Sequence, residues 1–401
     1  MTSPTTRPTR PRGRSGMAAA AGVALLLAAG LCLTPRAAQA YPQWQFSSGT
    51  TRCGQCHYSP SGGGLITGYA RDAVGEDLST WEGNGAFLHG GIDLPKSVAL
   101  GFDGRYAAMS HDVGEKRGAK QLYFPMQADL SARFSLSDSV SLHASVGYRG
   151  QARVGNEPLG VGGAVADGSS AFISREHYLM WRPAATGAYV RAGRFFAPFG
   201  LRLAEHYTYV RRDLGFNTLE ESYNLSGGWV ESAWEVHVTA FLPDVVRHIG
   251  GDETGAAVMY ELRAGEGSAV GVSARAGMKE DRNRYTGGVF AKTYLSGIKS
   301  LFQTELNLVH SIFSGGKAST QGFVGYAGIT VFPVRGLWLT PFAERAQTSI
   351  AVRDTATNAG GVQVNWFPYP HFELTLMGRA QLPAGNDTGA KTALVFIHYY
   401  L

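Results

Sequence analysis

Cysteine and long apolar runs are scarce in this sequence. Only three of its 401 residues are cysteine, and two of these, Cys53 and Cys56, belong to one short motif. A single close pair excludes the disulfide framework that stabilises many small exported domains. Beyond residue 40 no stretch approaches the roughly 18 consecutive apolar residues that a membrane-spanning helix requires. The sequence therefore predicts neither a disulfide-rich fold nor a helical membrane protein.

Residues 1–40 have the composition of a signal peptide. Basic residues come first, then an apolar segment from Met17 to Leu33, then the small-x-small site Ala38-Gln39-Ala40, which is the usual order in an export signal. We expect cleavage at this site, export, and a mature chain that begins at Tyr41. Cys32 follows Leu31 rather than a small residue, which argues against lipoprotein cleavage there. The basic residues before the apolar segment are Arg7, Arg10, Arg12 and Arg14.

The mature chain lacks net charge. The whole sequence has 36 basic and 31 acidic residues, but residues 1–40 contain five arginines and no acid. Without them 31 basic residues face 31 acidic ones. The apparent basic character belongs to the leader, so it gives no reason to expect nucleic acid as a partner.

Apolar residues at every second position are abundant after residue 96. Between Met126 and Leu136, for example, apolar and polar side chains alternate, which is typical of a half-buried β-strand. Many such segments have roughly the 9 to 12 residues that a tilted strand needs to cross a bilayer. About sixteen strands are predicted from this alternation, beginning near Ser97, Gln121, Ser139, Phe172, Ala188, Ser222, Ala233, Thr254, Gly267, Arg284, Lys299, Thr320, Leu337, Thr357, His371 and Gly389.

The predicted connections alternate between tight turns and longer polar loops. Even-numbered strands end in tight turns such as Ser137-Asp138, whereas odd-numbered strands end mostly in longer loops such as Val154 to Ala171 and Pro198 to Glu221. Short turns on one side, long loops on the other and an even number of strands are typical of outer-membrane barrels. A soluble β-sandwich also alternates, but it would not sort its loops by length onto two sides. We predict a mainly β fold, with an antiparallel barrel of about 16 strands over residues 96–401.

The small and polar face of these strands is predicted to point into the barrel. Charges on the lipid face would cost about 2–4 kcal/mol each at the bilayer midplane, so they are assigned to the lumen. Both signs occur there equally, which predicts a mixed wall that pairs across itself or holds a polar plug, rather than a strongly ion-selective lining. The assigned residues are Arg105, Arg133, Arg149, Arg263, Arg275, Arg379, Asp103, Asp129, Glu235, Glu261, Glu305 and Glu373.

The segment 41–95 contains the motif Cys53-Gly54-Gln55-Cys56-His57. Two thiols at this spacing can each add to one haem vinyl group, and the imidazole that follows then binds the iron as proximal ligand. The export signal agrees, since c-type haem is attached after export. The alternatives are a C-x-x-C disulfide with a chance histidine, although no thioredoxin-like βαβ unit is visible, or half of a zinc site, although no second ligand pair lies nearby. We predict one covalent haem c, held by Cys53, Cys56 and His57.

The second axial ligand of this haem is less well defined. The nearest downstream candidates are His89, Met109 and His111, and a lone histidine or methionine is commonly just packed or solvated. His89 is the best of them, because it lies between the haem motif and the first predicted strand. An open distal position would instead favour ligand binding or peroxide chemistry.

A signal peptide, a short single-haem segment and a porin-like barrel, in this order, resemble the fused outer-membrane cytochrome–porins. The residues that carry the resemblance are Pro42, Phe46, Gly49-Thr50, the haem motif, Pro60, Leu65 and Tyr69-Ala70-Arg71. The order Gly49-Thr50 and the run Gly62-Gly63-Gly64 depart from the family pattern. The resemblance implies electron transfer in the outer membrane of a Gram-negative-type bacterium, and its best-known members are implicated in ferrous iron oxidation.

Two functions follow from this architecture. In the first, the haem segment lies inside the barrel or at its periplasmic side and relays electrons between an extracellular donor or acceptor and a periplasmic carrier. An irregular loop and polar haem propionates need a barrel wall between them and the lipid, and one haem cannot by itself cover an apolar band about 25 Å tall. In the second, the barrel is a diffusion porin and its haem segment serves as a plug or sensor. A plain porin with a chance haem motif is a third alternative, and whether the protein is an enzyme stays open.

Overall fold

The structure is a computed structural model that describes residues 42–47, 49–112, 114, 118–149, 153–154, 157–158, 172–217, 220–244, 251–316, 318–385 and 389–401. The predicted leader and the predicted mature start at Tyr41 lie outside these residues. Among the described residues, no helix has the length and hydropathy needed to cross a membrane.

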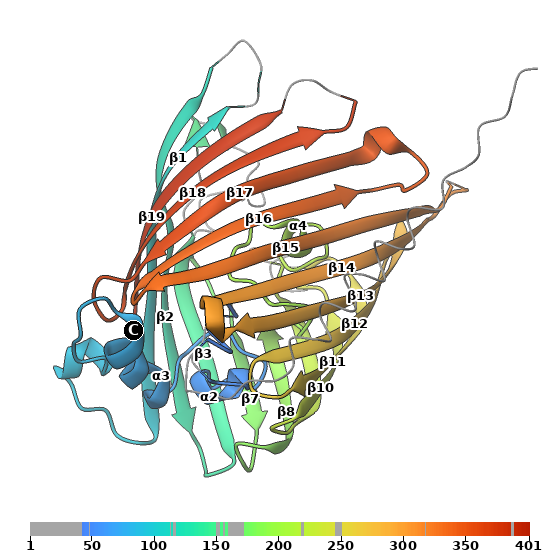
Figure 1. Cartoon of the computed structure of the whole chain (residues 1–401). Coiled ribbons are helices and arrows are strands. Elements are labelled where there is room, and N and C mark those ends of the chain that lie inside the picture. Colours follow the sequence, from blue (N-terminus) through green and yellow to red (C-terminus); the bar gives the residue numbers. More distant parts are fainter. Residues whose placement is uncertain are drawn as a thin grey trace, which may run out of the picture. The chain divides into compact units, whose positions relative to one another are not determined.

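Antiparallel strands form a closed barrel (Figure 1). Each strand pairs with its neighbour in sequence, and β1 closes the ring by pairing with β19 from Asp103↔Tyr400 to Asp112↔Lys391. Two short strands, β6 and β7, both pair with β3 and share one place in the wall, so the barrel has 16 strands, as predicted. The bounds are β1 (Val98–Asp112), β2 (Lys120–Ser135), β3 (Val140–Arg149), β6 (Phe172–Ile173), β7 (His177–Trp181), β8 (Gly187–Phe195), β9 (Ser222–Val230), β10 (Trp234–Leu242), β11 (Thr254–Ala264), β12 (Ser268–Lys279), β13 (Arg282–Leu295), β14 (Ser300–Phe313), β15 (Thr320–Val334), β16 (Leu337–Gln347), β17 (Ala356–Trp366), β18 (Phe372–Pro383) and β19 (Ala390–Tyr400), with a separate hairpin of β4 (Arg153–Val154) and β5 (Glu157–Pro158).

The strand starts agree with the alternation in the sequence to within two residues. Tight connections join β2 to β3, β7 to β8 and the later pairs up to β17 and β18, so they gather at one end, which we call the short-turn end. The opposite ends are joined mostly by longer loops. One connection there is tight, because only Glu280 and Asp281 separate β12 from β13.

The outer face of the wall is apolar and its inner face is buried. Large apolar side chains such as Leu308 and Leu382, 61% and 60% exposed, point outward, where lipid would surround a barrel of this kind. Most of the charges assigned to the lumen are buried inside, among them Arg263, Glu235 and Glu373. Asp103, Arg105 and Arg133 are half-buried, and the side chain of Arg149 lies outside the described residues.

The outward assignment of these side chains can be tested, because the cost of a charge on the lipid face depends on its depth in the bilayer. Leu308→Arg, in the middle of β14, should lower the free energy of unfolding in lipid vesicles by about 2–4 kcal/mol, because the guanidinium is forced into hydrocarbon. Leu382→Arg, at the end of β18, should cost only about 0–1 kcal/mol. Urea titrations of both variants measure the difference, and equal costs would contradict the outward assignment or the predicted depth.

The connection between β8 and β9 folds back into the barrel instead of projecting outward. This inward loop, described over residues 196–217 and 220–221, contains α4 (Tyr209–Arg212) and buries Leu201, Leu203 and Leu214. It binds the wall by hydrogen bonds from the backbone N–H of Leu201 to Glu305 (2.7 Å) and from that of Tyr209 to Glu344 (2.6 Å).

Around the inward loop the lumen has a hydrophobic core. Inward side chains from most of the wall strands pack against it, so this part of the lumen is less polar than the sequence predicts. The wall residues of this cluster are Ala107, Met109, Leu122, Phe241, Ala257, Met259, Phe290, Val324, Tyr326, Phe342, Ala359, Met377 and Leu394. Contacts such as these exclude water, which gives the barrel a packed interior at this level.

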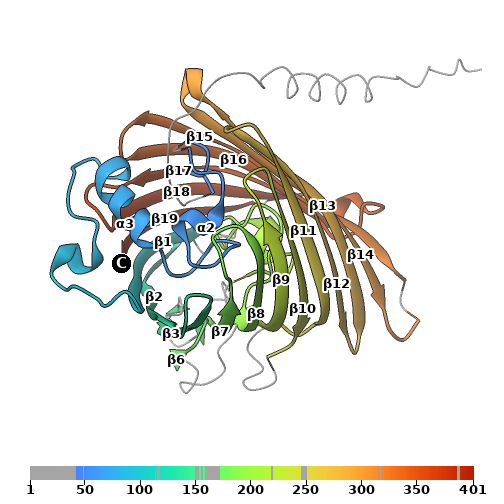
Figure 2. The ribbon, with the colours of Figure 1, turned by 90° about the horizontal axis from the view of Figure 1, so that it is seen from below.

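The N-terminal segment 42–97 enters the lumen at the short-turn end (Figure 2). Its first part carries α2 (Cys53–Cys56), which lies within the ring of strands, and its second part carries α3 (Gly68–Ala73), the π-helical turn η1 (Val74–Leu78) and the 3₁₀ turn η2 (Phe87–Gly90). Two further 3₁₀ turns, η4 (Ser296–Ile298) and η5 (Arg353–Thr355), belong to connections of the wall.

The second part of this segment is compact because its backbone packs on itself. A Cβ built on Gly85 would overlap the carbonyl oxygen of Arg71. Gly85→Ala should therefore destabilise residues 68–90 by about 1–3 kcal/mol, the usual cost of overpacking. Gly68→Ala is the matched control, since its Cβ would meet nothing within 4 Å and alanine favours a helix. Hydrogen exchange should accelerate over this region only in Gly85→Ala; similar exchange in both variants would contradict the packing.

Candidate functional site

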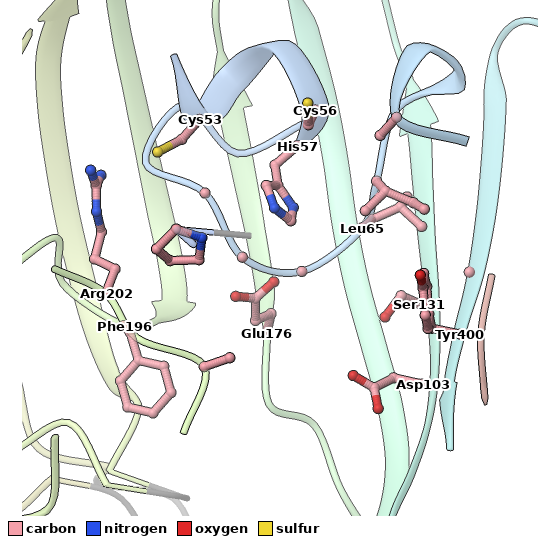
Figure 3. A pocket seen from close by; sticks show the side chains of 18 of the residues that line it. Cys53, Cys56, His57, Leu65, Asp103, Ser131, Glu176, Phe196, Arg202 and Tyr400 are labelled. Atoms are coloured by element: carbon pink, nitrogen blue, oxygen red, sulfur yellow. The ribbon is translucent and has the colours of Figure 1, made fainter. Parts of the chain in front are cut away.

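The haem motif forms one helical turn followed by a small loop. The N–H of His57 donates to the carbonyl oxygen of Cys53 (3.0 Å), and the Gln55 side chain accepts from the N–H groups of Thr51 and Arg52 (3.2 and 3.0 Å). Residues three apart in such a turn lie on the same face. Cys53 and Cys56 thus begin and end this turn, with His57 directly after them, but their sulfur atoms point in different directions in Figure 3.

Three consecutive glycines return the chain beneath the motif. Gly62, Gly63 and Gly64 have φ of +82°, +77° and +62°, a left-handed conformation that glycine adopts without the strain of a Cβ. A Cβ on Gly62 would lie 3.2 Å from that of Cys53. The run, which departs from the pattern of the cytochrome–porins, thus lets the backbone pass close under the first cysteine.

The two cysteines of the motif are free thiols that differ in burial, Cys53 being half-buried and Cys56 buried. Neither Cys53 nor Cys56 is in a disulfide, and Cys56 is only 1% exposed. Burial raises the pKa of the Cys53 thiol, and raises the pKa of Cys56 to about 12. Because the thiolate is the reactive form, the raised pKa of each thiol disfavours that form.

A cavity of about 370 Å³ lies beside the motif, and Cys53, Cys56 and His57 all line it (Figure 3). Its other walls come from the inward loop and from the inner faces of β1, β2, β3 and β19. A single buried water needs only about 10–15 Å³, so this space suits a much larger group. In Figure 3 the His57 ring extends from the motif into the cavity, and Glu176 stands on the wall beyond it.

An interruption in one strand brings two neighbouring charges to the cavity. Residues 174–176 separate β6 from β7, and both Arg175 and Glu176 line the cavity, whereas consecutive residues of a regular strand point to opposite faces. Arg175 pairs with Asp129 (2.7 Å). Breaks of this kind commonly re-aim side chains next to functional sites.

Arg202 and Arg211 bring positive charge to the cavity from the inward loop. Arg202 pairs with Glu235 (3.2 Å) and Glu261 (3.5 Å) of the wall. Arg211 differs, because the acceptors of its guanidinium are the backbone carbonyls of the loop itself, and burial lowers its pKa. Within the described residues Arg211 forms no ion pair, so its charge is available to an anionic group in the cavity.

Buried polar contacts fix the first part of the N-terminal segment in the lumen. Lys292 of β13 donates to Gln45 (2.6 Å) and pairs with Glu261 (2.7 Å). Arg191 of β8 donates to the hydroxyls of Ser59 (2.9 Å) and Ser61 (2.8 Å). Charged side chains of the wall thus bind the first part of this segment inside the lumen.

The structure brings Cys53, Cys56 and His57 together but leaves His89 outside the cavity. His89 is exposed near the short turn of β17 and β18, with Nε2 at 3.3 Å from the Tyr399 hydroxyl and its ring 5.3 Å from that of His371. Its segment runs along the wall there, because the N–H groups of Thr80 and Trp81 donate to carbonyl oxygens of that turn. Prediction of His89 as the distal ligand therefore has no support from this geometry.

The other distal candidates are also absent from the cavity lining. Met109 is buried in the hydrophobic core around the inward loop. His111, near the end of β1, lies with its Nδ1 2.9 Å from the hydroxyl of Thr392 in β19. A different histidine, His206 of the inward loop, does line the cavity. The sequence offers no signal for it, since Pro198 to Glu221 has the length and composition of an ordinary external loop. Among the described residues no group of three or more His, Cys, Asp and Glu side chains is arranged to hold a metal ion.

Comparison with solved structures assigns the barrel to a known architecture. OmpT, an outer membrane protein of Vibrio cholerae, aligns over 78% of this chain and 100% of its own with a TM-score of 0.57 and 10% identity. The fold is that of an outer-membrane porin. OprB of Pseudomonas putida aligns over 76% and 94% (TM-score 0.58, 10% identity), and the outer membrane channel DcaP of Acinetobacter baumannii over 76% and 97% (TM-score 0.53, 10% identity). These identities establish a shared fold only, and they support the predicted outer-membrane location. No family model and no curated protein matches the chain.

Proposed function

We propose that this protein is an outer-membrane barrel that carries one covalent haem in its lumen and passes electrons across the membrane. The observation that supports this most directly is that Cys53, Cys56 and His57 line one large cavity inside the barrel. Neither a chance motif nor a structural C-x-x-C pair needs such a space beside it.

The residues around the cavity fit a c-type haem. Cys53 and Cys56 would hold it by thioether bonds and His57 would bind its iron, which changes oxidation state by one electron. The apolar side chains of Leu65, Ile66, Val74, Phe196, Leu201 and Leu203 line the space. Arg211, which has no carboxylate partner among the described residues, would neutralise a propionate. The volume also lies within the range of about 300–1,000 Å³ typical of small-molecule sites.

The position of the motif suggests which partners it meets. In outer-membrane barrels the short turns face the periplasm, and the segment 42–97 enters at the short-turn end. A periplasmic electron carrier would therefore approach this end. The donor or acceptor on the other side would be extracellular, and a metal ion such as ferrous iron is our candidate from the cytochrome–porin resemblance.

A diffusion channel is the second candidate, and the likeness to porins favours it. In this case the segment 42–97 would act only as a plug or sensor. The hydrophobic core around the inward loop argues against it, because a solute pathway needs a hydrated passage past Tyr209 and its neighbours, which are fully buried. We therefore place electron transfer first.

Two measurements on the wild-type protein separate these functions. Haem staining and reduced-minus-oxidised spectra of purified outer membranes should show a covalent c-type haem at the size of this protein; its absence would rule out the proposal. Proteoliposomes with a trapped electron acceptor should then take up electrons from an impermeant external donor. Solute-driven swelling without electron uptake would favour the channel instead.

A further inference from the structure

We infer that His206 is the second axial ligand of the haem iron, opposite His57. This inference rests on the proposed haem and deepens it, because the distal ligand decides whether the iron only transfers electrons or also binds small molecules. The ligand would come from the inward loop of the barrel and not from the segment that carries the haem motif.

The residues that line the cavity leave few choices. Three histidines line it, His57, His206 and His398, and the lining contains neither methionine nor lysine. Imidazole is a common haem ligand, but it must offer a nitrogen lone pair to the iron. After His57 has taken the proximal position, two imidazoles remain.

Both ring nitrogens of His398 lie close to a carboxylate. Its Nδ1 lies 2.7 Å from an oxygen of Glu373, and its Nε2 lies 3.2 Å from an oxygen of Asp103. Two carboxylates beside one imidazole favour its protonated form, which keeps no lone pair for a metal. His398 is also in a strand of the wall, where it cannot approach the iron without breaking these contacts. It is therefore a poor ligand.

The backbone around His206 is fixed on both sides. The carboxylate of Glu205 accepts from Gln43 (3.1 Å) and from Gln363 of β17 (3.0 Å), and the Thr208 hydroxyl donates to the carbonyl oxygen of Glu205 (2.8 Å). Gln43 belongs to the same N-terminal segment as His57. These contacts tie the loop that carries His206 to the segment that carries the motif, and a ligand held in this way binds with little loss of entropy.

Two histidines from opposite directions would give the haem a closed coordination sphere. His57 reaches the cavity from the short-turn end, whereas the loop of His206 begins and ends at the long-loop ends of β8 and β9. A six-coordinate iron has no open position for oxygen or peroxide, so it favours electron transfer over catalysis at the metal.

The test uses the full-length protein, purified in detergent, with its haem content measured first. The ferric wild type should be low-spin by electronic absorption and electron paramagnetic resonance. His206→Ala should convert it to a high-spin form that binds added imidazole and then regains the low-spin spectrum. The matched control is His89→Ala, which removes the exposed histidine and should leave the spectrum unchanged.

A second variant covers the case in which His206→Ala does not fold. His206→Met retains a ligand and should raise the reduction potential, since methionine ligation raises it in c-type cytochromes. A low-spin His206→Ala spectrum without added imidazole, or a spin change in His89→Ala, would overturn the assignment of His206 while leaving the proposed function intact. Absence of haem from the wild type would rule out both the assignment of His206 and the proposed electron-transfer function.

Discussion

A chain with Cys53→Ala and Cys56→Ala together should lose its covalent haem completely, and electron transfer across proteoliposomes should fall to the background of empty vesicles. The thioether bonds are the only covalent attachment that the motif provides. Since one haem is the only redox centre we propose, no parallel route remains. The measurement is haem staining of the purified protein, followed by electron uptake into vesicles with a trapped acceptor.

The matched control for this variant is Cys32→Ala. Cys32 belongs to the predicted leader and should be absent from the mature protein, so its replacement should change neither haem content nor electron transfer. The double variant should still form a barrel, which the usual change of gel mobility on heating verifies. Electron uptake at the wild-type rate by a folded double variant would refute the conduit.

Glu235→Gln should lower the free energy of unfolding by about 3–5 kcal/mol, the usual cost of breaking a buried ion pair. Glu235 is 0% exposed and pairs with Arg263 and with Arg202 (3.2 Å). An amide cannot balance these charges, so two guanidinium groups would remain buried with too little compensation. Because Arg202 also donates to the carbonyl oxygen of Ser61 (3.0 Å), the damage should extend to the plug.

Urea unfolding in detergent measures this loss, and protease digestion of the segment 42–97 reports on the plug. Glu266→Gln provides the control, because Glu266 is an exposed residue in a short turn, where a charge contributes little. If the two variants unfold at the same urea concentration, the buried network does not stabilise the protein.

The barrel could be predicted from the sequence because its signal is local and repeated. Alternation within each strand separates a lipid face from an inner face. Because this pattern recurs in sixteen successive strands, few topologies other than an antiparallel barrel fit the sequence. No comparable local pattern in the sequence indicates whether a loop projects outward or folds into the barrel. Pro198 to Glu221 is a long polar connection with scattered leucines, and it turns inward through contacts with distant strands, such as those with Glu305 and Glu344.

The motif was visible in the sequence for a similar reason, since Cys53, Cys56 and His57 lie within five positions of the chain. The distal ligand that we propose does not have this property. Proximity in sequence favours His89, but the chain beyond Leu78 is held at the rim by the turn of β17 and β18. His206 is far from the motif in sequence and reaches the cavity only because the barrel closes around both segments.

The seam between β1 and β19 has a consequence for the order of assembly. The segment 42–97 directly precedes β1, and the C-terminal Leu401 lines the same cavity as Cys56. Once the first and last strands have paired, the wall surrounds a thiol that is 1% exposed and has a pKa of about 12. An attachment enzyme could then neither reach nor activate it. A haem of the kind we propose would therefore have to be attached before the first and last strands pair.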